Sequence, residues 1–174
     1  GFGQDPDITQ AVFETLDQVS RKDNAALQVS AFRYSPQGMS GIKSISHELH
    51  RQMPQGINHV FCQAGGGGLA MGMAQGFLDL QQSGELSKPP QVHIVQPEGN
   101  DTMASALRFG KTETTPVESW TKVSGLQVAS ITDGNEAVRD CRATQGNAKQ
   151  TNVKQSKAEQ SRATQSKAMQ SRAK

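Results

Sequence analysis

The sequence lacks both the long hydrophobic run of a membrane-spanning protein and the cysteine framework of a disulfide-stapled one. Nowhere do apolar residues continue for the roughly 18 positions that a membrane helix needs. The 174 residues include two cysteines, Cys62 and Cys141, which favour a reducing, cytoplasmic setting. The segment Gly1–Asp5 is neither basic nor apolar. We therefore expect no signal peptide, and we interpret the chain as processed or as a piece of a longer one.

Aromatic residues and net charge are also scarce. Phe, Trp and Tyr make up 5% of the chain, and 18 basic side chains nearly balance 16 acidic ones, for a formal net charge of +2. The charge is uneven, because residues 145–174 hold seven basic residues and one acidic residue. The average composition is therefore not that of a polyanion-binding protein, and two compositional regions share the polypeptide.

Residues 145–174 form six five-residue repeats that each begin with Gln: QGNAK, QTNVK, QSKAE, QSRAT, QSKAM and QSRAK. A period of five matches no helical period, and the only sizeable apolar side chains are Val153 and Met169. We predict a disordered tail or an isolated helix, since no apolar stripe can be buried. Two interpretations stay open for the tail. Basic repeats can bind acidic surfaces, whereas the absence of stacking aromatics favours a low-complexity end without a nucleic-acid partner.

The first 144 residues alternate between helix-like and strand-like patterns. Helical spacing of apolar residues occurs in Ile8–Val19, Ile42–Met53, Leu69–Leu80, Met103–Leu107 and Ala137–Cys141. Strands are predicted for Leu27–Phe32, Ile57–Cys62, Val92–Val95 and Leu126–Ile131. The alternation predicts an α/β fold with three αβα layers and a mostly parallel sheet. We expect Asn100 or Asp101 to cap the fourth helix and Asp133 to cap the last one. The predicted division is a domain at 1–144 and a tail at 145–174.

Four consecutive glycines, Gly65–Gly68, lie between a predicted strand and a predicted helix. In a parallel sheet this position is the carboxyl edge, where ligands bind. Glycines let the main chain approach an anion closely, and the start of a helix adds its positive dipole end, so the expected ligand is a phosphate. The segment lacks the Lys-Ser/Thr of a nucleoside-triphosphate loop and the spacing of a dinucleotide loop. A tight strand-to-helix turn without a ligand is the alternative.

The neighbouring motifs make the glycine run more specific. Upstream lies Gly38-Met39-Ser40-Gly41-Ile42-Lys43-Ser44-Ile45; Asn58-His59-Val60-Phe61 precedes the glycines, and Val95-Gln96-Pro97-Glu98-Gly99 follows. This order resembles the pyridoxal-phosphate enzymes of the tryptophan-synthase-β fold type, and among them the threonine synthases, over roughly 38–146. The resemblance implies that the phosphate of pyridoxal 5'-phosphate is bound by Gly65, Gly66, Gly67, Gly68 and the amide of Leu69. It also implies that the Gly41–Ser44 turn borders the active-site cleft.

The resemblance also indicates what the chain lacks. The family attaches its cofactor to a lysine in a region that would precede Gly1, and Lys43 belongs instead to the later turn. The residue that faces the pyridine nitrogen normally follows the last helix, where this chain enters its repeats near Ala143. We therefore assign no catalytic residue, and we predict weak cofactor binding without turnover. We also expect association or poor solubility, because a missing half-domain would leave apolar surface uncovered.

Three functions remain candidates. The first is a fragment of a threonine synthase-like lyase, whose parent would convert O-phosphohomoserine to threonine and phosphate. The second is a fragment of a threonine/serine dehydratase or of a diaminopropionate-type ammonia-lyase. The third is a non-catalytic module with a basic interaction tail. For the enzymes we expect a small amino-acid substrate, no membrane partner, and either an oligomer or a missing half-domain. No metal is predicted, since His47 and His50 are three residues apart rather than four.

Overall fold

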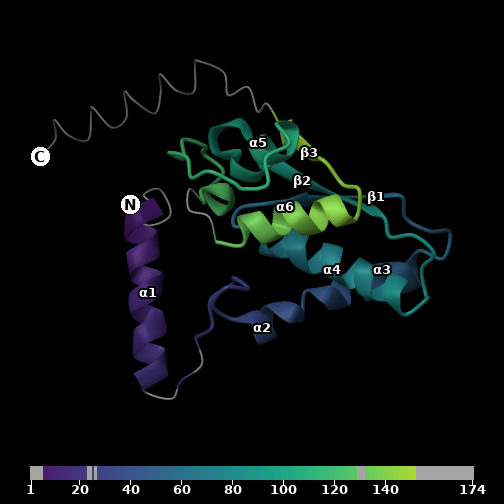
Figure 1. The fold of residues 1–174 in the computed structure, drawn as a ribbon, viewed down its shortest axis with the longest axis horizontal. Helices are drawn as coiled ribbons and strands as arrows, with labels where there is room; N and C mark the ends of the chain where they lie inside the picture. The colour runs from purple at the N-terminus through teal and green to yellow at the C-terminus, as the bar shows by residue number, and fades with distance from the viewer. Residues whose placement is uncertain (1–5, 23–24, 26, 129–131, 152–174) are drawn as a thin grey trace, which may run out of the picture.

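The chain folds into helices around a small parallel sheet, as the sequence predicts. The computed structural model describes residues 6–22, 25, 27–128 and 132–151. Its strands are β1 His59–Gln63, β2 Gln91–Pro97 and β3 Ala148–Thr151. Its helices are α1 Pro6–Lys22, α2 Pro36–Ser40, α3 Lys43–Gln52, α4 Gly68–Gln82, α5 Thr102–Arg108 and α6 Gly134–Ala143, with 3-10 turns at Glu98–Asn100 and Ser124–Leu126 (Figure 1). Within the described residues, no helix combines the length and apolarity required to cross a membrane.

The sheet has the order β1-β2-β3, and both strand pairs are parallel. One face carries Cys62 and Ile94, which are buried against the helical layer that contains Phe77 of α4 and Val138 of α6. The α/β class and the parallel sheet are therefore confirmed. On the opposite face of β1, the side chain of Phe61 is 51% exposed. The second helical layer expected on that face remains a prediction.

Helix α4 packs against α3 through a row of glycines spaced four residues apart, because that spacing places them on one face of a helix. A Cβ on Gly72 would lie 2.6 Å from Cγ2 of Ile42, and one on Gly76 would lie 2.7 Å from the main-chain oxygen of Lys43. The fully buried hydroxyl of Ser46 donates to the main-chain oxygen of Met73 at 2.8 Å. The helix backbones thus approach more closely than larger residues would allow.

The structure differs from the sequence prediction at Leu27–Phe32, which is not a strand. Alternate side chains of Leu27–Ala31 are partly buried and exposed, as the pattern indicates. However, the main-chain N–H of Phe32 donates to the carboxylate of Asp133, and that of Ala31 donates to the oxygen of Val29. The alternating pattern therefore reports which side chains are buried, although the segment does not form a strand. The predicted strand Leu126–Ile131 begins in a 3-10 turn at Leu126, and its residues 129–131 lie outside the described residues.

Strand β3 lies inside the range predicted to be a tail. Gly146 passes so close to β2 that a Cβ there would overlap the main-chain oxygen of Val92. The N–H of Ile94 donates to the oxygen of Asn147, and Ala148–Thr151 then continues the parallel ladder. For these four residues the structure differs from the expected disorder or isolated helix, because main-chain pairing needs no apolar side chain. Beyond Thr151 the tail lies outside the described residues.

Gly76→Ala tests the close contact between α3 and α4. We expect this substitution to lower the free energy of unfolding by about 1–3 kcal/mol, because its Cβ meets main chain that cannot move aside. Urea denaturation followed by circular dichroism measures the change. Gly125→Ala is the control, since a Cβ there meets nothing within 4 Å. Equal stability of the two variants would contradict the packing described.

Candidate functional site

The glycine run forms the turn between β1 and α4. Ala64 still belongs to the sheet ladder, because its N–H donates to the oxygen of Val95 at 3.0 Å. Gly67 then reverses the chain with a φ of 97°, a left-handed conformation that favours glycine, and it is the N-cap of α4. A Cβ on Gly67 would lie 3.0 Å from Cβ of Ala137 and 3.1 Å from Sδ of Met103. Both backbone conformation and crowding therefore require glycine at this position.

The turn presents main-chain N–H groups at the start of a helix. Within the described residues, the N–H groups of Gly65, Gly66, Gly67, Gly68 and Leu69 have no hydrogen-bond acceptor. The structure thus brings all five predicted site residues together at the carboxyl edge of the sheet. Unpaired N–H groups beside a helix N-terminus fit an anion such as a phosphate. Neither of the two described cavities is lined by these residues, and their role as binders remains a prediction.

Asn100 fixes the segment that lies against this turn. Its fully buried side chain donates from Nδ2 to the main-chain oxygens of Leu126 and Val128, at 2.6 and 3.0 Å. A Cβ on Gly65 would lie only 2.9 Å from Cγ2 of Val128. The other side-chain atom, Oδ1 of Asn100, is buried without a partner among the described residues. The sequence prediction treated Asn100 only as a possible helix cap.

Asp133 ties the glycine turn to a distant loop. Its main-chain N–H donates to the oxygen of Gly66 at 3.1 Å, and its carboxylate accepts from the N–H groups of Phe32 and Arg33 at 2.8 and 3.1 Å. Burial raises the pKa of the Asp133 carboxyl, and these two hydrogen bonds oppose the shift. Asp133 is the N-cap of α6 by position, as predicted, but its side chain makes no capping hydrogen bond.

Gln96 performs the capping that the sequence analysis assigned to Asn100 or Asp101. Its fully buried Oε1 accepts from the N–H groups of Met103 and Ala104, at 2.8 and 2.9 Å, at the start of α5. Asp101 is the N-cap residue but makes no side-chain cap and pairs with Arg108. A glutamine near the end of a strand carries no recognised capping pattern, so nothing in the sequence signalled this role.

The Gly41–Ser44 turn packs along α4 rather than gathering at its start. The ammonium of Lys43 forms an ion pair with Asp79 at 3.0 Å. Asp79 lies 11 residues after Gly68, or about 16 Å along the helix axis. Lys43 therefore lies away from the glycine turn. The sequence also assigned it to the separate Gly41–Ser44 turn. The residue of this region that reaches the turn is Met39, whose Cε is 2.6 Å from the position of a Cβ on Gly68.

Both cysteines, Cys62 and Cys141, are free and buried. Burial raises the pKa of the Cys62 thiol to about 11 and also raises that of Cys141. A thiol with a raised pKa is rarely present as the nucleophilic thiolate. Across the part of the chain that the structure describes, no three potential metal ligands gather in one place.

The comparisons with known proteins bear on the family and the fold. Residues 2–167 match a protein-family model described as pyridoxal-phosphate dependent enzyme. No curated protein matches the sequence. Among solved structures, the processed form of threonine deaminase isoform 2 from Solanum lycopersicum is 24% identical with a TM-score of 0.59, covering 77% of this chain and 34% of its own. Maize serine racemase is 24% identical with a TM-score of 0.57, covering 77% and 38%.

A third similar structure is the selenomethionine-labelled holo diaminopropionate ammonia lyase from Escherichia coli. It is 20% identical with a TM-score of 0.52, and the match covers 77% of this chain and 33% of that one. These likenesses establish a shared fold. The chain spans about a third of the length of the structures that it matches.

Asp133→Asn tests the burial of the carboxyl group that joins the loop at Phe32 to the glycine turn. Because burial raises the pKa of Asp133, its protonated form is favoured in the folded state. The stabilisation linked to this proton is fully present below the ordinary pKa of aspartate and is lost as the pH rises through the raised value. We therefore expect the wild type to gain stability relative to the variant as the pH falls from 7 toward 4. Urea denaturation across this range measures the difference, and a constant difference would contradict the assignment.

Proposed function

Because the chain belongs to the pyridoxal-phosphate-dependent enzymes, we propose that its glycine turn binds the phosphate of pyridoxal 5'-phosphate, the cofactor of that family. The observation that carries the proposal is the set of N–H groups from Gly65 to Leu69 that have no acceptor among the described residues. They lie at the start of a 15-residue helix, whose dipole favours a negative group. The four glycines leave no side chain between the main chain and the ligand.

The protein's part in this binding is electrostatic and positional. When bound, the cofactor supplies a ring that accepts electrons from the amino-acid substrate. The residues of this chain would hold the phosphate and fix its orientation, while Asn100 and Asp133 keep the turn in place through their main-chain contacts. Three hydrogen bonds to a charged phosphate contribute about 1.5–3 kcal/mol each. Association costs about 4–15 kcal/mol, so we expect weak binding to this chain alone.

We place the whole protein among lyases that act on small amino acids. The folds of threonine deaminase isoform 2 and diaminopropionate ammonia lyase support elimination from such a substrate. The order of the Gly41–Ser44 turn and the glycine run supports a second candidate, the threonine synthase reaction on O-phosphohomoserine. In this proposal residues 1–144 are part of the cofactor-binding domain of a cytoplasmic enzyme. The remaining two-thirds of the fold would complete the site, as an extension or an associated chain.

A comparison of pyridoxal phosphate with pyridoxal tests the phosphate site. We expect the chain to bind the phosphorylated compound weakly and pyridoxal at least about tenfold more weakly, since the charge-assisted hydrogen bonds are absent. Inorganic phosphate should compete, and the visible spectrum should show no attachment to a lysine. Calorimetric titration with both compounds measures the affinities. Equal affinities would remove the basis of the proposal.

Gly67→Ala, with Gly84→Ala as its control, links that binding to the turn. Both glycines have a positive φ, 97° and 80°, and they lie at opposite ends of α4. The two variants therefore carry a similar backbone strain, whereas only the first meets Ala137 and Met103. We expect Gly67→Ala to abolish phosphate-dependent binding and Gly84→Ala to retain it. Loss of binding in both would indicate a general loss of folding.

The two candidate reactions have different products. In a whole protein that carries this segment, 2-oxo acid formed from threonine or serine would support elimination. Phosphate released from O-phosphohomoserine, together with threonine, would support the second candidate instead. Either result is independent of the phosphate test on the present chain, because that test measures binding and not turnover.

A further inference from the structure

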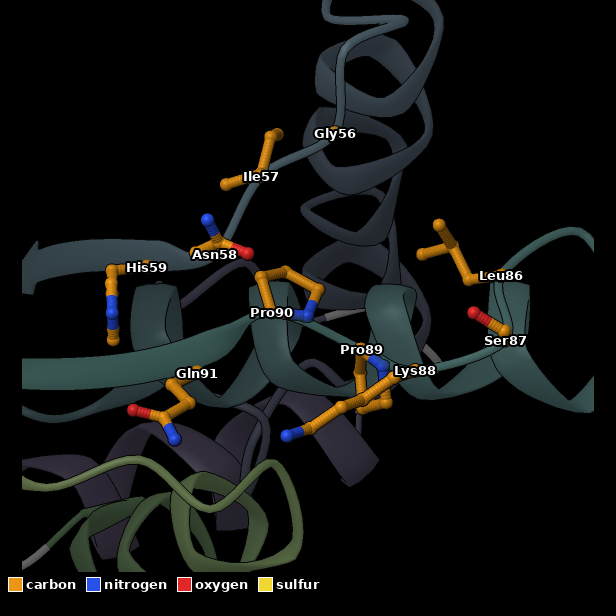
Figure 2. Close-up of a pocket in the computed structure, with 10 residues that line it drawn as sticks. All are labelled: Gly56, Ile57, Asn58, His59, Leu86, Ser87, Lys88, Pro89, Pro90 and Gln91. Carbon is orange, nitrogen blue, oxygen red and sulfur yellow. The ribbon is translucent and has the colours of Figure 1, made fainter.

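A cavity lies at the opposite edge of the sheet from the glycine turn. It has a volume of about 430 Å³ and is formed where the chain enters β1 and β2. Figure 2 shows the two connections that line it, Gly56–Asn58 before β1 and Leu86–Pro90 before β2. The N–H of Gln91 donates to the oxygen of Asn58 at 2.9 Å, which joins the two walls. A volume of this size suits a small organic molecule.

The walls of the cavity are rigid and partly apolar. Pro89 and Pro90 are buried, and proline fixes its own φ. Ile57 and Leu86 are half-buried and pack against the main core. These four side chains provide an apolar surface for the body of a ligand.

The permanent charge on the walls of the cavity is positive. Of its ten lining residues, Lys88 is the only one with a permanent charge, and none is acidic. The preceding acid, Glu85, does not line the cavity and accepts a hydrogen bond from Ser83. In Figure 2 the Lys88 side chain extends toward the side on which Gln91 and His59 lie. A single ammonium balances one negative charge, which favours a monoanion over a doubly charged phosphate.

A histidine pair adds a hydrogen-bond donor at this end. The N–H of Asn147 donates to Nδ1 of His93 at 3.1 Å, so neutral His93 carries its proton on Nε2. That nitrogen lies 3.0 Å from Nδ1 of His59 and donates to it. His59, which lines the cavity, therefore carries its own proton on Nε2, where it can donate to a ligand.

From these observations we propose that the cavity between Asn58 and Gln91 binds a small organic monocarboxylate with an apolar body. Lys88 contacts the carboxylate, and the His59 Nε2–H and the amide of Gln91 complete its hydrogen bonds. The apolar body lies against Ile57, Leu86 and Pro90. The site is separate from the glycine turn and does not depend on cofactor binding.

Calorimetric titration of the full 174-residue chain with hexanoate tests this site. We expect hexanoate to bind, acetate to bind more weakly because it lacks the apolar body, and hexylamine not to bind because its charge is reversed. Lys88→Gln should weaken hexanoate binding about tenfold, as expected for one lost charge-assisted hydrogen bond. It should leave the affinity for pyridoxal phosphate unchanged.

Lys22→Gln is the matched control, since this exposed lysine ends α1 and lines neither described cavity. It should bind hexanoate like the wild type, and the circular dichroism spectra of both variants should match that of the wild type. Absence of hexanoate binding would overturn the proposal. It would also be overturned by equal binding of hexylamine or acetate, or by unchanged affinity in Lys88→Gln.

Discussion

The left-handed turn at Gly67 is the constraint on which the rest of the arrangement depends. Between the end of β1 at Gln63 and the start of α4 at Gly68, the chain turns at Gly67, whose φ is 97°. Met103 of α5 and Ala137 of α6 lie 3.1 and 3.0 Å from the place where a Cβ would be, closer than ordinary van der Waals contact. Three helices therefore converge on a position that has no side chain. The N–H groups of the same turn have no acceptor among the described residues, which is the basis of the proposed phosphate site.

The sequence was sufficient for the elements that bury a continuous face. The stripe from Leu69 to Leu80 predicted α4, and the apolar run from Val92 to Val95 predicted β2, because burial is encoded locally by periodic side chains. It was insufficient at Leu27–Phe32, where the alternation of burial is real but the main chain bonds to Asp133, about 100 residues away. A local pattern reports which side chains are buried and does not report which partner takes the main-chain hydrogen bonds.

The candidate site was likewise predicted only in part from the sequence. Its glycines were found from the sequence because a left-handed turn and close main-chain approach demand that residue type. The polar side chains that hold the site, Gln96, Asn100 and Asp133, were missed or given other roles. Each acts on main-chain groups whose position is set only by the fold, the oxygens of Leu126 and Val128 among them. Strand β3 was also not predicted from the sequence. Its pairing with β2 uses main-chain atoms, so the five-residue repeat of side chains carries no sign of it.

The two proposed anion sites, at opposite edges of the sheet, differ in their physical means of recognition. At the carboxyl edge the donors are main-chain N–H groups, so their direction is fixed by the turn and no side-chain entropy is lost on binding. At the amino edge the charge belongs to the flexible, exposed side chain of Lys88, and rigidity comes instead from Pro89 and Pro90. The first arrangement suits a cofactor that must be held in one orientation for chemistry. The second tolerates ligands of varied shape, because an ammonium on a four-carbon chain can follow the carboxylate.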